Sequence, residues 1–139
     1  MFVSLGREWL VDAGGCKPEH LRDVVRLQDL CNTILGDLGL HVVGECLWHR
    51  FPEPGGVTGL YLLTESHLAV HTYPEYQSIT FSLYCCKSRP RWPWEQHLRV
   101  WLDAKRVHVR TFRRGVSGPR GPCRPVDLHE VQLVENHER

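Results

Sequence analysis

The amino-acid sequence predicts a single domain of the α+β class, a two-layer sandwich in which helices pack on one face of an antiparallel β-sheet. The chain has 139 residues, which is enough for one domain with its own core. Most regular stretches alternate apolar and polar side chains, whereas two stretches have a helical period. One strand pattern is half polar, which is typical of an antiparallel sheet with one face outside the core.

The first half of the domain is expected to contain a strand, a helix and a second strand. Residues 3–13 mix apolar and charged positions and predict the first strand. Apolar side chains recur near every 3.6 residues from Pro18 to Leu38, which predicts a helix with Pro18 in its first turn and Gly39 just past its end. His41–Phe51 is the next expected strand, and the proline- and glycine-rich Pro52–Gly56 is a turn.

The middle of the chain has three consecutive strand patterns, at Val57–Leu63, His67–Tyr73 and Ser78–Cys86. The first two are separated by Thr64–Glu65–Ser66. In the third, apolar side chains alternate cleanly with polar ones, so the face with Cys85 is expected in the core and the face with Cys86 outside it.

A second amphipathic helix is indicated by the apolar positions between Trp94 and Leu102, after Pro90–Pro93 ends the preceding connection. Lys105–Phe112 has a strand pattern. The glycines and prolines of Gly115–Pro125 predict a loop, and Val126–Val134 is expected to form a last strand.

Composition excludes several classes of protein. A net charge of +1 argues against a dedicated nucleic-acid binder, so the short cluster Arg110, Arg113 and Arg114 is interpreted as a solvated strand end and loop. No apolar stretch approaches the ~20 residues that span a bilayer, so we expect no membrane association. Arg7 and Glu8 stand where a signal peptide would have its apolar core, so we expect a cytoplasmic location. The six cysteines have no CxxC spacing and are expected to be free thiols.

The stretch Leu63–Glu75, with the sequence L-T-E-S-H-L-A-V-H-T-Y-P-E, carries the chemistry. A serine hydroxyl held against its own preceding carbonyl can attack it and convert the amide into an ester. Elimination of that ester leaves dehydroalanine, which hydrolyses to a pyruvoyl group at a new N-terminus. From the residues alone, Ser66 is more simply a turn serine.

This stretch resembles the processing site of the bacterial and archaeal S-adenosylmethionine decarboxylases, in which E-S-H is followed by a histidine and T-W/Y-P-E. Cys86 lies 20 residues after Ser66, as in that family. Further matches, in the same order as in the family, are Ser4–Arg7, His49–Phe51 before Gly56–Gly59, Ala104–Val109 and Arg114–Gly115.

The resemblance implies a self-cleaving proenzyme with one covalent cofactor. The chain would cut itself between Glu65 and Ser66, giving fragments 1–65 and 66–139, with a pyruvoyl group made from Ser66. That group would form a Schiff base with the substrate amine and act as the electron sink when CO2 leaves. His71 corresponds to the base that removes the α proton of Ser66, and Thr58 replaces a family serine that assists processing. Cys86 corresponds to the proton donor in decarboxylation.

The resemblance also implies the substrate, S-adenosylmethionine, decarboxylated for spermidine biosynthesis. Glu75 corresponds to the carboxylate that holds the ribose hydroxyls, and Phe51 and Tyr73 to aromatics of the nucleoside pocket, although both are equally well read as ordinary sheet aromatics. The family pattern is lost between Glu75 and Cys86, where Ser82 replaces an aspartate. Two alternatives therefore stay open: pyruvoyl-dependent decarboxylation of arginine or ornithine, and a ligand-binding relative that does not cleave itself.

Two further expectations concern the assembly and metals. By resemblance, two processed protomers form a homodimer with the active sites at their interface. The strand parity of His67 and His71 would allow a zinc site with Cys86 nearby, but this spacing is not diagnostic, and no metal is predicted.

Overall fold

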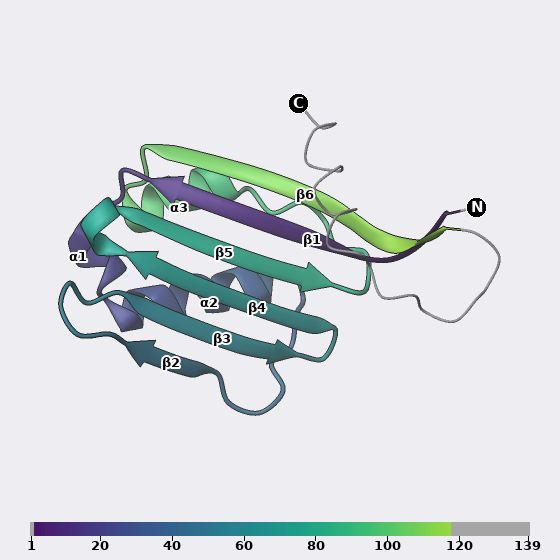
Figure 1. Ribbon diagram of the computed structural model, residues 1–139. Coiled ribbons are helices and arrows are strands. Elements are labelled where there is room, and N and C mark those ends of the chain that lie inside the picture. The colour runs from purple at the N-terminus through teal and green to yellow at the C-terminus, as the bar shows by residue number, and fades with distance from the viewer. Residues whose placement is uncertain (1, 118–139) are drawn as a thin grey trace.

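The computed structural model describes residues 2–117. In it, six strands form one antiparallel sheet, and the helices lie against one face of this sheet (Figure 1). The elements are β1 (Phe2–Gly14), α1 (Pro18–Leu21), α2 (Val24–Asp37), β2 (Leu47–Arg50), β3 (Val57–Leu63), β4 (Ser66–Tyr73), the 3-10 helix η1 (Pro74–Tyr76), β5 (Ser78–Cys85), α3 (Trp94–Leu102) and β6 (Arg106–Ser117). The spatial order of the strands is β2-β3-β4-β5-β1-β6, so the N-terminal strand lies inside the sheet. The α+β sandwich expected from the sequence is confirmed.

The core lies between the sheet and the helices. In β5 every second side chain is buried, beginning with Ile79 and ending with Cys85, as the alternation of the sequence predicted. These side chains meet the apolar stripes of α2 and α3. The fully buried members with the largest side chains are Trp94, Tyr61, Phe81, Leu21, Leu27, Leu30, Ile34, Leu68, Ile79, Leu83, Leu98 and Leu102. The opposite face of the sheet is not covered by any helix of the described residues (Figure 1).

The helix expected over Pro18–Leu38 is two helices, which corrects the prediction. The chain breaks at Asp23, whose side chain accepts a hydrogen bond from the backbone N–H of Arg26 at 3.1 Å and caps α2. Aspartate favours this position because its carboxylate satisfies a backbone donor that has no partner within the helix. Gly39, with φ of +65°, follows α2 in the left-handed conformation expected there.

The strand expected over His41–Phe51 is much shorter than predicted. Only Leu47–Arg50 forms β2, and before it Val42 makes one isolated bridge to Leu63. Gly44 between them has φ of +71°, a left-handed conformation that a continuous strand does not contain. The apolar pattern is therefore interrupted by backbone geometry.

The last described strand runs further than predicted. β6 pairs with β1 along its length up to Phe2↔Ser117, so Gly115 belongs to a strand and not to a loop. A Cβ at Gly115 would lie 2.1 Å from the carbonyl oxygen of Val3, which explains why a glycine occupies this position. Arg110, Arg113 and Arg114 are all strand residues. The remainder of the expected loop and the expected strand Val126–Val134 lie outside the described residues.

Candidate active site

Ser66 begins β4 directly after a two-residue hairpin loop, and its backbone is unusual. Short hairpin loops normally place a positive φ within the loop itself. Neither Thr64 nor Glu65 has one, whereas Ser66 has φ of 154°, a conformation that an L-residue rarely adopts. The backbone distortion of this hairpin is therefore concentrated at the residue predicted to react.

The carbonyl of the Glu65–Ser66 peptide is held by a backbone donor. Cys86 N–H donates a hydrogen bond to Glu65 O at 3.1 Å. On the other side of the same peptide, Ser66 Oγ lies 3.2 Å from Nδ1 of His67. The structure thus gathers a donor for the carbonyl oxygen, a hydroxyl and an imidazole around one peptide bond. We call Glu65, Ser66, His67 and Cys86 the cleavage cluster.

The two adjacent cysteines differ in environment as the sequence predicted. Cys85 pairs with Ser66 in the sheet, and its side chain is fully buried on the core face. Burial raises the pKa of its thiol to about 11; the nearby charge of Arg89 lowers this pKa and that of Glu65 raises it, both by smaller amounts. Cys86 lies one residue past the end of β5 and is exposed. Of the two thiols, only that of Cys86 is accessible from outside the core.

A second group of predicted residues meets at the other end of β4. Thr58 and His71 are paired across β3 and β4, and Thr58 Oγ1 is 2.5 Å from His71 Nδ1. When Nδ1 carries the ring proton and donates it to this hydroxyl, Nε2 is left free to accept a proton. This arrangement suits a base whose ring orientation is fixed.

Two aromatic rings flank His71. The ring centroid of Tyr73 lies 4.4 Å from that of His71, and the ring of Phe51 lies 5.7 Å away, both edge-on. Phe51 and Tyr73 keep 43% and 39% of their surface exposed, so they border an open surface and do not fill the core. Glu75, in η1, follows shortly after Tyr73 and is exposed. We call Phe51, Thr58, His71 and Tyr73 the histidine cluster.

The two clusters are too far apart to act on each other within one chain. Ser66 and His71 are five residues apart on β4, whose pairing with β5 is regular from Ser66↔Cys85 to Tyr73↔Ser78. At about 3.3 Å per residue, the two Cα atoms are separated by roughly 16 Å. The resemblance implied that both residues belong to one site at a dimer interface; within a single copy of the chain, His71 does not reach Ser66.

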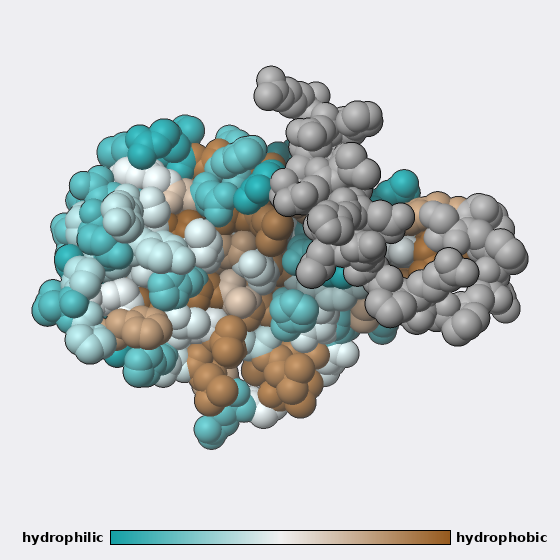
Figure 2. Space-filling view, viewed as in Figure 1, coloured by the Kyte–Doolittle hydropathy of each residue, from teal (hydrophilic) through white to brown (hydrophobic). Residues whose placement is uncertain are grey.

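By the alternation of β3 and β4, the sheet face opposite the helices carries Thr58, His71 and Tyr73 of the histidine cluster and His67 of the cleavage cluster. No helix of the described residues covers this face (Figure 1). Hydrophobic side chains gather on it near β2 and β3, beside a more hydrophilic surface (Figure 2). Leu47, Leu60 and Leu62 are the exposed apolar residues of these strands. An apolar patch beside polar site residues is typical of a surface that another molecule covers.

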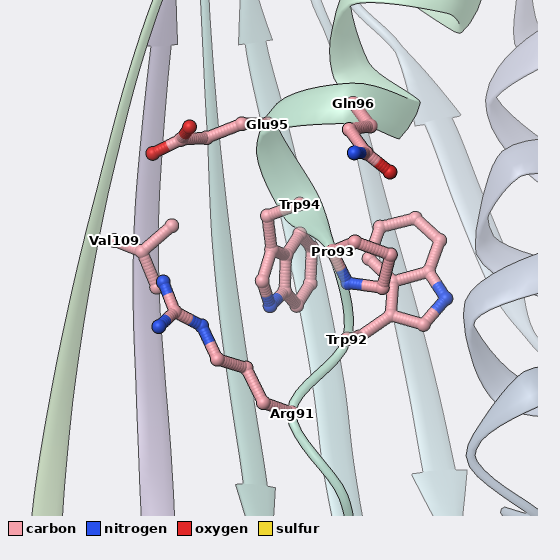
Figure 3. A pocket seen from close by; sticks show the side chains of 7 residues that line it. All are labelled: Arg91, Trp92, Pro93, Trp94, Glu95, Gln96 and Val109. Carbon is pink, nitrogen blue, oxygen red and sulfur yellow. The ribbon is translucent and has the colours of Figure 1, made fainter.

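A hollow of about 250 Å³ lies on the helix side of the sheet, between the start of α3 and β6 (Figure 3). Its wall is formed by Arg91–Gln96 together with Val109, and the Arg91 side chain reaches across toward Val109. None of the residues of the two clusters lines it. The hollow is thus separate from the predicted site.

Two negative findings apply to residues 2–117. No three or more His, Cys, Asp or Glu side chains in this range are grouped so that they could hold a metal ion. No helix in the same range combines the length and apolar character needed to cross a bilayer.

Comparison with solved structures identifies the class of fold. The chain is similar to a crystal structure of the adenosylmethionine decarboxylase from Aquifex aeolicus, with a TM-score of 0.69 over 86% of this chain and 98% of that one. At 24% identity this similarity shows the fold alone.

Sequence comparison then identifies the family. The sequence model described as S-adenosylmethionine decarboxylase matches residues 7–115. Proteins named S-adenosylmethionine decarboxylase proenzyme are similar to this chain. The one from Thermotoga petrophila is 36% identical, and the match covers 81% of this chain and 85% of that protein. The one from Pelotomaculum thermopropionicum is 32% identical, and the match covers 81% of this chain and 88% of that protein. The chain belongs to the S-adenosylmethionine decarboxylase family.

One feature of the site was not predicted from the sequence. Arg89 forms an ion pair with the Glu65 carboxylate and thereby contacts the residue before the predicted cut. The available signal was weak: a carboxylate that is largely buried needs a cationic partner, but sequence alone does not show that Glu65 is buried.

Proposed function

We propose that this chain is a self-processing, pyruvoyl-dependent decarboxylase that converts S-adenosylmethionine into decarboxylated S-adenosylmethionine and CO2. The observation that carries the proposal is the geometry of the Glu65–Ser66 peptide, in which the backbone distortion falls on Ser66 and the carbonyl oxygen accepts from Cys86 N–H. Family membership supports it, because relatives that match most of this chain are named as proenzymes of this activity.

The first step of processing is attack of Ser66 Oγ on the carbonyl carbon of Glu65. Negative charge then develops on the carbonyl oxygen, where the Cys86 N–H already donates. The C–N bond breaks as the nitrogen takes up a proton, and the amide becomes an ester between Glu65 and the side chain of Ser66. His67 Nδ1, 3.2 Å from Ser66 Oγ, lies within reach of the hydroxyl proton.

The second step requires a base at the α carbon of Ser66. Removal of that proton expels the Glu65 carboxylate and leaves dehydroalanine, which takes up water and releases ammonia to give the pyruvoyl group. We assign this base to His71, held by Thr58. Because His71 lies roughly 16 Å from Ser66 along β4 of the same chain, the base must come from a second copy.

We therefore propose a homodimer in which the open sheet faces of two copies pack together. A two-fold axis through the middle of β4 would place the histidine cluster of one copy against the cleavage cluster of the other. Ala69, near the middle of β4, lies on the same face as the exposed Leu60 that pairs with it and allows close approach there. Isologous contact of one patch with itself is the common form of dimer symmetry.

The proposed pyruvoyl group, made from Ser66, supplies a carbonyl that accepts electrons when the substrate loses CO2. The exposed Cys86 thiol is proposed to return a proton to the substrate's α carbon. Phe51 and Tyr73 present aromatic faces suited to a nucleoside and to the sulfonium cation, and Glu75 is proposed to bind the ribose hydroxyls. The free thiols of the described cysteines fit a cytoplasmic enzyme.

Denaturing mass spectrometry of the purified protein tests the proposal. We expect a 65-residue fragment and a 74-residue fragment with a blocked N-terminus, and an intact chain for Ser66→Ala, which lacks the attacking oxygen. CO2 release is then measured from S-adenosylmethionine, arginine and ornithine separately. An uncut chain after long incubation refutes self-processing, and a higher kcat/KM for arginine or ornithine refutes the nucleoside substrate.

A further inference from the structure

Glu65 is held by contacts to its side chain as well as to its backbone carbonyl. Nη2 of Arg89 contacts both carboxylate oxygens of Glu65, and the side chains of Arg89 and Glu65 keep only 19% and 13% of their surface exposed, respectively. Lys87 Nζ lies 4.0 Å from the same carboxylate but is 70% exposed, so water screens its contribution. Arg89 is therefore the principal cationic partner of Glu65.

Both contacts come from one short segment. Cys86 donates its N–H to the Glu65 carbonyl, and three residues later Arg89 holds the Glu65 side chain. Two anchors on one residue restrict rotation about its backbone, and the atom that Ser66 attacks lies between them. A partly buried ion pair holds its geometry better than an exposed one, because water competes less for its groups.

We propose that Arg89 is a positioning residue for self-cleavage, fixing the Glu65 carbonyl against the Cys86 N–H and within reach of Ser66 Oγ. Arg89 does not contact the reacting atoms, so its effect passes through Glu65. This inference rests on the proposed function, and it concerns the first step, the shift from amide to ester, and not the later elimination. Orientation of this kind is sensitive, since a displacement of about 1 Å can cost ~100-fold in rate.

The test compares cleavage rates of freshly purified Arg89→Ala, Arg89→Lys and the control Arg91→Ala. Arg91 is two residues further along, is exposed and is not a partner of Glu65. We expect Arg89→Ala to cleave ~10- to 100-fold more slowly and Arg89→Lys to recover part of the rate, because lysine keeps the charge but lacks the planar guanidinium that places Nη2 on the carboxylate. Arg91→Ala should cleave at the normal rate. Cleavage of Arg89→Ala at the normal rate overturns the proposal.

A second experiment separates positioning from general destabilisation. In His71→Ala the elimination is blocked, so the ester accumulates, and hydroxylamine cleaves the chain at this ester after Glu65. Adding Arg89→Lys or Arg89→Ala to His71→Ala should lower the fraction of chains that hydroxylamine cleaves. The thermal unfolding midpoint of each variant is measured as well and should show a folded protein. Glu65→Gln combined with Arg89→Ala should be no slower than either change alone, because both remove one interaction. Additive slowing, or an unchanged ester fraction, overturns the proposal. A wild-type chain that never cuts overturns the proposed function itself.

Discussion

Two inactive variants should restore each other's cleavage if the active site is shared between copies. Ser66→Ala removes the attacking hydroxyl but keeps Thr58 and His71, whereas His71→Ala removes the base but keeps Ser66. Neither is expected to complete cleavage when produced alone. In a mixed dimer, His71 of the first variant would face Ser66 of the second, and one complete site would form.

The expected yield follows from the geometry and from random pairing. Ser66 and His71 of one chain are roughly 16 Å apart, far beyond the ~3 Å of a hydrogen bond, so transfer within a chain is excluded. With equal amounts of the two variants, about half of the dimers are mixed, and each has one complete and one doubly inactive site. About half of the His71→Ala chains, or about a quarter of all chains, should therefore be cut.

Co-production of the variants with tags of different mass allows mass spectrometry to assign each fragment. Only the His71→Ala chain should appear cut, at Glu65–Ser66. The matched control pairs His71→Ala with a chain carrying both substitutions, which offers no intact His71 and should give no cleavage. Absence of cleavage in the first mixture, or equal cleavage of His71→Ala alone, refutes the shared site.

The remaining predictions concern single side chains. Cys85→Ala should lower the free energy of unfolding by about 1–2 kcal/mol in urea titrations, because Cys85 is fully buried. Cys86→Ala should keep the stability of the unchanged protein and lose most CO2 release. The reverse result would contradict the assignment of Cys85 to the core and Cys86 to the outside. Glu75→Gln should raise the KM for S-adenosylmethionine severely and leave self-cleavage intact, and normal kinetics would exclude Glu75 from ribose binding. Thr72→Val should lower the free energy of unfolding by about 1–3 kcal/mol. The buried Thr72 hydroxyl accepts a hydrogen bond from a β3 backbone N–H at 2.9 Å and donates one to the carbonyl that ends α1 at 2.7 Å. A loss below about 0.5 kcal/mol, which is roughly that of a surface substitution, would contradict this role.

The fold class was predictable from the sequence, because the alternation and period of apolar side chains are local properties. The residues proposed for processing came from the resemblance to the decarboxylase family. Alternation in Ser78–Cys86 assigned Cys85 to the core and Cys86 to the outside, and the structure confirms both environments. The bounds of β3 were predicted correctly for the same reason. Side-chain period and spacing along the chain carry this information without any knowledge of distant contacts.

Tertiary structure alone decided how those residues meet. The break at Asp23 and the loss of strand at Gly44 depend on backbone conformations that the apolar pattern does not encode. The ion pair between Glu65 and Arg89 joins residues 24 apart, and it forms because the β4–β5 register brings the end of β5 beside the hairpin. The same register keeps Ser66 and His71 at opposite ends of a straight strand. Residues that form one motif in sequence are thus divided between two ends of the sheet, because an extended chain separates neighbours by about 3.3 Å per residue.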